Sequence, residues 1–271
     1  MDLLKQTIEL CRLYDIKPAR SRGQNFLIQE EIYDRMVEQA DLQPDDVVLE
    51  VGPGLGFLTA KLAAQVKKVI TVEFDDKLAE VLKIGLAAKG VENVEVVNED
   101  ILKFSTRLPD GQVFNFQYKI VANLPYNITS IFLRKFLEAE IRPELMVLML
   151  QKEVAERITA KAGKMSLLAV SVQFYAQPEI LKIVEKENFW PKPEVDSAIV
   201  KLEVRSKKLE VNPVKSGYAS AKQFNEVNEK DFFRLVKFGF SAKRKMLKNN
   251  LAAGFGISHE AAENKITKAG F

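Results

Sequence analysis

The stretch VVLEVGPGLG at residues 47–56 decides the fold that we expect for this chain. Residues 47–51 form a short apolar run, which is typical of a buried parallel strand, and glycines then follow at every second position. Residues 57–65 come next and have the periodicity of a helix with one apolar face. Strand, glycine turn and helix in this order open the nucleotide-binding half of a doubly wound sheet. Glycine is needed at Gly52 because the backbone must turn tightly there and approach a ligand closely.

Acidic residues follow near the ends of the next two predicted strands. Residues 66–74 form the second strand and carry Glu73, where a carboxylate can accept hydrogen bonds from both hydroxyls of a ribose. Residues 93–98 form the third strand, and Asp100 comes shortly after it. We expect Asp100 to lie beside Gly52 and Glu73 at the carboxyl edge of the sheet, where it would read the exocyclic amine of an adenine. The alternative is that Asp100 only caps a helix that begins at the next residue.

The tetrapeptide NLPY at residues 123–126 carries the strongest indication of chemistry. It closes an apolar run at residues 118–122, which is typical of a buried strand. The side-chain oxygen of Asn123 can accept a hydrogen bond from an amine, and the proline fixes the turn. The ring of Tyr126 offers a face on which a nucleobase can stack. An aromatic amine held in this way could be methylated, whereas the alternative is a strand-end turn with a surface tyrosine.

The alternation of the remaining segments predicts a doubly wound, mostly parallel α/β fold with helices on both faces of a seven-stranded sheet. The expected strands are residues 47–51, 66–74, 93–98, 118–122, 145–150, 179–186 and 197–204, and the later helices are residues 128–137, 152–161 and 166–176.

The chain divides into two predicted domains, residues 1–205 with the sheet and residues 206–271 with a small helical unit. Residues 207–227 are polar and irregular, as in a linker. Two helices are expected beyond it, at residues 231–251 and 259–269, and an amphipathic helix is expected at residues 1–13.

Composition excludes several classes of protein. With 271 residues, 47% of them hydrophobic, the chain can bury one substantial core and a small second domain. Its single cysteine, Cys11, excludes an internal disulfide and fits a reducing cytosol. The single histidine, His259, excludes a Cys/His metal cluster, so we expect no metal. We find neither a signal peptide nor an apolar run of about 20 residues, and therefore expect a cytoplasmic protein without a membrane segment.

Positive charge is concentrated near the C-terminus. The whole chain has a net charge of +3, but residues 206–271 hold 13 Lys or Arg against 6 Asp or Glu. The densest part of this excess is Lys243, Arg244, Lys245 and Lys248, and a second basic group near the start consists of Arg12, Lys17, Arg20 and Arg22. Beside a nucleobase-modifying site, we expect such residues to contact RNA phosphates. The alternative is that they solvate a helix or cover its apolar side with their stems.

Together these motifs make the chain resemble the ribosomal RNA adenine dimethylase family. The resemblance covers nearly the whole sequence, in segments at residues 22–27, 50–56, 123–126, 149–157, 189–197 and 244–251. One departure lies at residues 162–166, which read AGKMS where the family usually has a Tyr-Gly-Arg-type segment. The family's contacts at that loop are therefore not carried over to this chain, whereas the main chemistry is.

The resemblance implies an enzyme with a Rossmann-like methyltransferase sheet that ends in an antiparallel hairpin. It would use S-adenosyl-L-methionine to dimethylate adenine amines in small-subunit (16S) rRNA, on the RNA or the immature small ribosomal subunit, and would act as a monomer. The Asn123 side chain and the Leu124 carbonyl would hold the amine, while Tyr126 and Phe189 would sandwich the extruded adenine. Phe189 could equally be a core aromatic. The implied cofactor contacts are Asn25, Leu27, Gly52, Glu73, Asp100 and Asn123, and the implied RNA contacts are Lys243, Arg244, Lys245 and Lys248.

Three alternatives stay open at this point. The first is a large-subunit rRNA adenine methyltransferase of the antibiotic-resistance type, which residues 243–251 disfavour. The second is a non-catalytic RNA-binding assembly factor that keeps the fold, which the intact Gly52, Glu73, Asn123 and Tyr126 disfavour. The third is a nicotinamide dehydrogenase, which the spacing G-x-G-x-G disfavours because dinucleotide enzymes use G-x-G-x-x-G.

Overall fold

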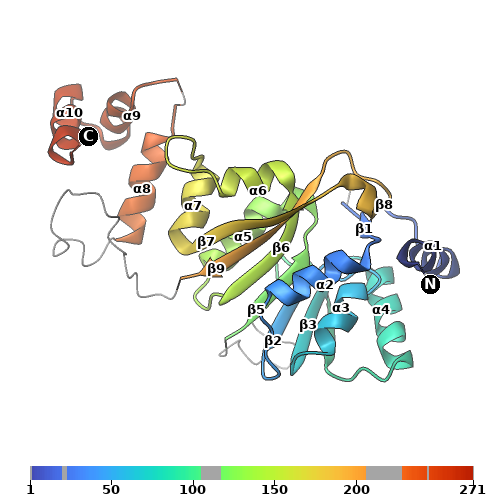
Figure 1. The fold of residues 1–271 in the computed structure, drawn as a ribbon. Coiled ribbons are helices and arrows are strands. Elements are labelled where there is room, and N and C mark those ends of the chain that lie inside the picture. The colour runs from blue at the N-terminus through green and yellow to red at the C-terminus, as the bar shows by residue number, and fades with distance from the viewer. Residues whose placement is uncertain (1, 20–22, 105–116, 206–227, 243, 271) are drawn as a thin grey trace.

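A seven-stranded sheet forms the centre of the molecule (Figure 1). The computed structural model describes residues 2–19, 23–104, 117–205, 228–242 and 244–270. Five parallel strands come first in the chain: β2 (Val47–Val51), β3 (Lys68–Glu73), β4 (Val94–Asn98), β5 (Lys119–Asn123) and β6 (Leu145–Gln151). The antiparallel strands β7 (Ala176–Val184) and β9 (Ser197–Val204) complete the sheet. The predicted doubly wound fold and its closing hairpin are confirmed.

The order of the strands places a ligand crevice in the middle of the sheet. The order is β4-β3-β2-β5-β6-β9-β7, so the chain starts at β2, runs outward to β4 and then returns to β5 on the other side of β2. The direction of winding therefore reverses between β2 and β5. Ligands of open α/β sheets bind at the carboxyl ends of the strands at such a reversal.

Helices cover both faces of the sheet (Figure 1). One face carries α2 (Glu30–Gln39), α3 (Phe57–Ala63) and α4 (Asp76–Ala88), and the other carries α5 (Thr129–Leu137), α6 (Lys152–Ile158) and α7 (Leu167–Tyr175). Successive strand residues point to opposite faces, so Val48 joins the apolar cluster of α2 and α3 while Leu49 joins the cluster of α5 and α7. The central strands are apolar on both faces because both faces are buried.

The segment at residues 162–166, where the sequence departs from the family pattern, connects α6 to α7. Gly163 adopts a left-handed conformation there, with φ of 88°. The hydroxyl of Ser166 accepts a hydrogen bond from the Ala169 N–H at 3.2 Å and so caps α7. The departure therefore lies in a turn with its own capping residue.

The N-terminal segment is tied to a distant loop by a second, small sheet. Helix α1 (Leu3–Leu13) leads to the short strand β1 (Phe26–Leu27), which pairs with β8 (Phe189–Trp190). In this pairing Leu27 lies opposite Phe189. The pairing brings together two motifs that are far apart in the sequence.

The predicted C-terminal helix at residues 231–251 is wrong as one continuous helix. The structure has α8 (Glu229–Gly239) and α9 (Leu247–Phe255), followed by α10 (His259–Lys268). The side-chain amide of the buried Asn250 donates to the carbonyls of Gly239 and Ala242 at 2.9 and 3.1 Å and so satisfies the end of α8. The turn lets α9 pack back on α8, where Gly254 lies so close to the Phe238 ring that a Cβ would be 2.3 Å from it.

Aromatic side chains dock α8 onto α7. The Phe174 and Phe232 rings stack with centroids 4.6 Å apart, and the Tyr175 and Phe233 rings stack at 5.6 Å. Arg142 lies over the Tyr175 ring, 4.5 Å from its centroid. The first C-terminal helix is therefore packed against the sheet-bearing part. The predicted linker lies outside the described residues, and the domain division at residues 205 and 206 stays a prediction.

None of the helices in the described part of the chain is long and apolar enough to cross a membrane.

Candidate functional site

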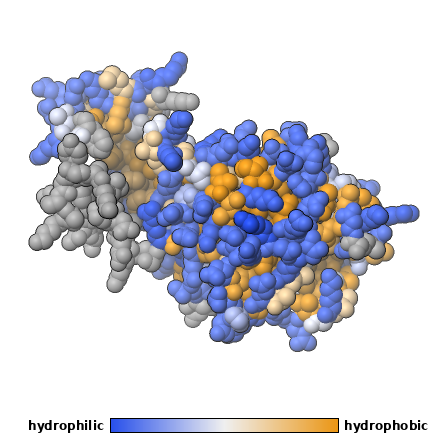
Figure 2. All heavy atoms as spheres, in the orientation of Figure 1, coloured by the Kyte–Doolittle hydropathy of each residue, from blue (hydrophilic) through white to orange (hydrophobic). Residues whose placement is uncertain are grey.

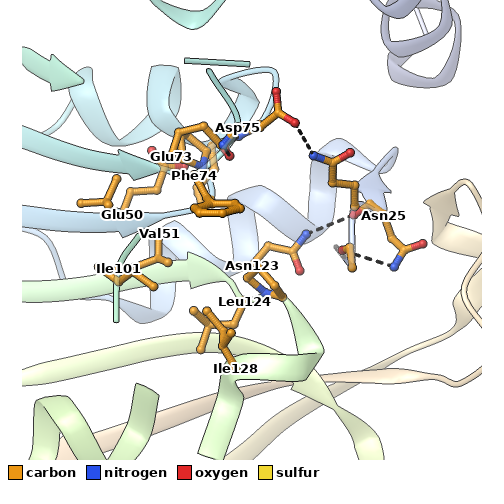
Figure 3. Close-up of a pocket in the computed structure, with 18 of the residues that line it drawn as sticks. Asn25, Glu50, Val51, Glu73, Phe74, Asp75, Ile101, Asn123, Leu124 and Ile128 are labelled. Atoms are coloured by element: carbon orange, nitrogen blue, oxygen red, sulfur yellow. Dashed lines mark hydrogen bonds between the residues drawn. The ribbon is translucent and has the colours of Figure 1, made fainter. Parts of the chain in front are cut away.

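A pocket of about 300 Å³ lies at the carboxyl ends of β2, β3, β4 and β5 (Figure 3). This volume is at the lower end of the range for small-molecule sites. Nearly all of the residues predicted for the cofactor and the target amine line this one pocket: Asn25, Leu27, Gly52, Glu73, Asp100, Asn123, Leu124 and Tyr126. Phe189, Arg244, Lys245 and Lys248 do not line it.

Glu73 holds the glycine loop in place. One carboxylate oxygen accepts the Gly54 N–H at 3.1 Å, and the other accepts the Asp75 N–H at 2.9 Å. Gly54 has a φ of 56°, and a Cβ there would lie 3.1 Å from the Phe26 ring, so a side chain would strain the loop. Burial raises the pKa of Glu73, and the two N–H donors oppose that shift. Glu73 is therefore a structural acceptor as well as a pocket residue.

Asp100 is both a pocket residue and a cap. Its carboxylate accepts the Leu102 N–H at 2.9 Å, as the capping alternative predicted. The segment that it caps is a turn at residues 101–103, where a helix was expected. Asp100 therefore has both of the positions considered from the sequence: it caps the segment that follows it, and it lines the pocket.

Two apolar side chains that sequence reasoning missed line the pocket beside these carboxylates. Phe74 follows Glu73 directly and is 62% exposed, and Figure 3 shows its ring projecting into the pocket. Ile101, which is buried, follows Asp100 and lines the same pocket. An apolar residue after each strand-end carboxylate was the available signal. A planar base can rest on such surfaces while the carboxylates take its polar groups.

Glu50 is a third residue that sequence reasoning missed. It lines the pocket but is only 1% exposed, and the Thr59 hydroxyl donates to its carboxylate at 2.7 Å. Burial raises the pKa of Glu50, the Thr59 hydrogen bond lowers it and the nearby Glu73 raises it, and the result of all three is a pKa of about 8. A neutral carboxyl group is therefore expected under the glycine loop at pH 7. The acidic residue before the first glycine was the visible signal.

Glu50 should make stability depend on pH. The pKa of its carboxyl group is about 8 in the folded chain against an ordinary 4.5, so the folded state binds the extra proton between these values. Its contribution is fully present below pH 4.5 and is lost as pH rises through 8. We expect the free energy of unfolding of Glu50→Gln to depend less on pH across this window, by on the order of a few kcal/mol. Urea unfolding at several pH values measures this, with the exposed Glu80→Gln as control. Parallel wild-type and Glu50→Gln profiles would contradict it.

Asn123 is oriented by the N-terminal segment. Its side-chain N–H donates to the main-chain oxygen of Asn25 at 3.5 Å. This hydrogen bond fixes the orientation of the amide and therefore the direction in which its oxygen points. The Asn25 side chain donates in turn to the Gly23 carbonyl at 3.4 Å. Figure 3 shows Asn123 facing the same space as Phe74. Leu124 is buried, and its N–H donates to the Met149 carbonyl at 3.2 Å, so the end of β5 is held to β6.

Tyr126 and Phe189 occupy different environments. The Tyr126 and Ser197 hydroxyls are hydrogen-bonded at 2.7 Å, and burial raises the pKa of Tyr126. Phe189 is 2% exposed and belongs to the apolar cluster that contains Leu27. The core-aromatic alternative therefore describes Phe189 in this structure, and its stacking on a base stays a prediction that requires the ring to become accessible.

The described basic residues of the C-terminal cluster, Arg244, Lys245 and Lys248, lie away from the pocket. Figure 1 shows the C-terminal helices at the opposite end of the molecule from α1, and in Figure 2 hydrophilic side chains alternate with apolar ones over them. Arg244 and Lys245 are exposed, whereas the Lys248 ammonium pairs with Glu263 at 3.0 Å. Lys243 lies outside the described residues. In the N-terminal group Arg12 and Lys17 are exposed, and Arg20 and Arg22 lie outside the described residues.

Within the residues that the structure describes, no three His, Cys, Asp or Glu side chains gather as ligands for a metal ion.

Comparison with known proteins identifies the group to which this site belongs. A model of the ribosomal RNA adenine dimethylase family matches residues 17–269. The chain belongs to this family. The resemblance seen in the sequence is confirmed, and the protein is an rRNA adenine dimethyltransferase.

Individual members of the dimethylase family agree. "Ribosomal RNA small subunit methyltransferase A" of Dehalococcoides mccartyi is 43% identical, over 99% of this chain and 86% of that protein. The protein of the same name from Enterococcus faecalis is 39% identical, over 93% of this chain and 81% of that protein.

Two solved structures share the fold. A dimethyladenosine transferase from Plasmodium falciparum is 31% identical with a TM-score of 0.68, and the match covers 82% of this chain and 73% of that one. The 23S rRNA methyltransferase ErmE is also 31% identical, with a TM-score of 0.66 and 84% of both chains covered.

Proposed function

We propose that this dimethylase uses S-adenosyl-L-methionine to dimethylate adjacent adenines of small-subunit rRNA during ribosome biogenesis. The observation that carries the proposal is one pocket with nucleoside-type acceptors, Glu73 and Asp100, on one wall and Asn123 and Tyr126 on another. The relatives named for the small subunit support the choice of RNA. We further propose that the enzyme acts as a monomer on the immature small subunit in the cytoplasm.

The pocket fits this cofactor. The glycine loop leaves room for a ligand because Gly52 and Gly54 carry no side chain, and both have φ values of the left-handed region. Glu73 keeps lone pairs for ribose hydroxyls beyond the N–H groups that it already accepts. Asp100 would accept from an adenine amine, with Phe74 and Ile101 against the ring. Asn25 and Leu27 would close the pocket from the N-terminal segment.

The other wall of the pocket would hold the target adenine. S-adenosyl-L-methionine supplies an electrophilic methyl group on its sulfonium, so the enzyme mainly has to orient the nucleophile. The Asn123 side-chain oxygen and the Leu124 carbonyl would accept the hydrogen bonds of the adenine amine. This favours a pyramidal nitrogen with its lone pair toward the methyl group. The Tyr126 ring, fixed through Ser197, would stack on the base after its extrusion from the RNA.

Mapping transferred methyl groups tests the proposal. The wild-type enzyme and S-adenosyl-L-methionine with a tritiated methyl group are incubated with a mixture of immature small subunits and large-subunit RNA, and the label is located by digestion of the RNA. We expect two methyl groups on each of two adjacent adenines of the small-subunit RNA. Label confined to large-subunit RNA would replace the proposal with its alternative, and no transfer to any RNA would refute it.

The large-subunit alternative has one observation in its favour, the similarity to the 23S rRNA methyltransferase ErmE. That protein is 31% identical to this chain, whereas the relatives named for the small subunit reach 43%. We therefore retain the small-subunit proposal.

The basic C-terminal residues are proposed to contact RNA phosphates. Replacing Lys243, Arg244, Lys245 and Lys248 together with alanine should weaken RNA binding and lower its salt dependence. The slope of log affinity against log salt should fall by about 0.7–0.9 for each phosphate that the variant no longer neutralises, through reduced counterion release. Filter binding to small-subunit RNA at several salt concentrations measures the slope.

Two controls sharpen this experiment. Lys83→Ala with Lys89→Ala removes exposed charge near α4 and should leave the slope unchanged. Cofactor binding should also be unchanged in the quadruple variant, because Arg244, Lys245 and Lys248, the members that the structure describes, do not line the pocket. A folded quadruple variant with the wild-type slope would establish that the side chains only solvate the helices.

A further inference from the structure

Lys135 of helix α5 makes an unusual set of contacts beside the pocket. Its ammonium donates to the main-chain oxygens of Ile101 at 3.0 Å, Leu102 at 2.8 Å and Phe104. An ammonium has three N–H donors, so these carbonyls account for all of them. Burial lowers the pKa of Lys135, while the nearby Asp100 and Glu99 carboxylates oppose that shift. A charged lysine is thus held against three backbone carbonyls.

These carbonyls belong to the turn that carries two pocket residues. The Asp100 carboxylate caps the turn through Leu102, and the Asp100 carbonyl accepts the N–H groups of Lys103 and Phe104, each at 2.8 Å. Ile101 and Phe104 are buried, so their carbonyls have little access to water. A buried carbonyl without a donor costs about as much as a lost hydrogen bond. Lys135 therefore stabilises the far side of a turn whose near side faces the pocket.

Lys135 belongs to a helix that continues from one wall of the pocket, and it contacts the turn that forms the other wall. Helix α5 begins at Thr129, directly after the segment that carries Asn123 and Tyr126. The turn that holds Asp100 and Ile101 follows β4, which lies on the other side of β2 and β3 from β5. Lys135 thus links two parts of the site. Its helix, α5, continues from the pocket wall that is proposed to hold the target adenine, and its ammonium binds the turn that forms the wall proposed for the cofactor.

We propose that Lys135 is a positioning residue, which clamps the turn at residues 100–104 so that Asp100 and Ile101 meet the adenine of the cofactor. The inference rests on the proposed function, since it takes the ligand of this wall to be S-adenosyl-L-methionine. Lys135 does not line the pocket and acts only through the turn.

The test uses Lys135→Met, which keeps most of the apolar stem and removes the three donors. We expect the KM for S-adenosyl-L-methionine, and the Kd of S-adenosylhomocysteine measured by calorimetry, to rise about tenfold or more, because three backbone carbonyls, including those of the buried Ile101 and Phe104, lose their donor. The kcat at saturating cofactor should stay within a few fold. Lys135→Arg should restore part of the affinity. The neighbouring Arg134→Met is the matched control, because Arg134 is exposed and pairs only with Glu138 among the ion pairs of the described residues.

A second ligand separates positioning from general destabilisation. In the analogue of S-adenosylhomocysteine whose adenine amine is replaced by oxygen, Asp100 meets an acceptor and not a donor. The wild type should bind this analogue more weakly than S-adenosylhomocysteine, and Lys135→Met should lose most of that discrimination. If Lys135→Met does not fold, Lys135→Gln is compared in the same way.

Three outcomes would overturn the inference. A folded Lys135→Met with wild-type affinity for S-adenosylhomocysteine would show that the hydrogen bonds of Lys135 to the turn do not affect cofactor binding. Equal weakening of both ligands would show a structural role only. A wild-type protein that binds neither ligand would refute the proposed function and this inference with it.

Discussion

Replacing Asn123 with alanine is expected to lower the rate of methyl transfer by at least about 100-fold. The Asn123 oxygen is proposed to act on the adenine amine as its nitrogen becomes pyramidal, so its contribution appears in the transition state. The affinity for S-adenosyl-L-methionine should stay within a few fold, because Glu73, Asp100 and Phe74 remain in place. Single-turnover transfer to small-subunit RNA and calorimetry with the cofactor measure the two quantities separately.

Two further variants define what the Asn123 amide does. Asn123→Asp keeps an acceptor oxygen but loses the N–H that donates to the Asn25 carbonyl. It therefore tests whether the acceptor oxygen is sufficient or must also be oriented by that hydrogen bond. The matched control is Gln65→Ala, which removes an exposed amide that does not line the pocket. Cofactor affinity that falls in Asn123→Ala as steeply as the transfer rate would assign Asn123 to the cofactor or to structure.

Glu73→Ala is expected to act first on cofactor binding. The proposed hydrogen bonds to the ribose contribute about 1–3 kcal/mol, and the variant also removes the acceptor of the Gly54 and Asp75 N–H groups. The loss should therefore lie at or beyond the upper end of this range, because the glycine loop loses its anchor as well. Calorimetry with S-adenosylhomocysteine measures the affinity, and urea unfolding measures any loss of stability.

Glu73→Gln separates the two roles of this carboxylate. The amide keeps one oxygen for a backbone N–H but places a donor where the other oxygen accepts, so cofactor binding should fall less than in Glu73→Ala. The exposed Glu80→Ala of α4 is the control for loss of charge. Unchanged affinity in both Glu73 variants would mean that the ribose lies elsewhere.

The sequence by itself determined the strands of the main sheet and the chemistry of the strand ends. Apolar runs of strand length with helical segments between them require a sheet covered on both faces, since each run must be buried on both sides. The glycine loop, Glu73, Asp100 and the NLPY segment were visible because each lies at the end of a strand or shortly after it. Their common location follows from the parallel direction of the strands, whose carboxyl ends meet at one edge.

Long-range packing decided what the sequence did not show. The break between α8 and α9 depends on Asn250 reaching back to the Gly239 and Ala242 carbonyls, an interaction that helical periodicity does not encode. The burial that keeps Phe189 in the core arises from segments more than 100 residues away, including β1, which pairs with its strand.

The same reason accounts for two residues that sequence reasoning missed, one in the pocket and one beside it. Glu50 looks like an ordinary acidic residue, and only its enclosure beneath the glycine loop raises its pKa. Lys135 looks like one charge among many on an amphipathic helix, and only the fold sets the turn after β4 against its ammonium. Residue types and local spacing determined which groups stand at the strand ends. The tertiary structure decided which groups are buried and what holds them, because burial and backbone partners come from distant parts of the chain.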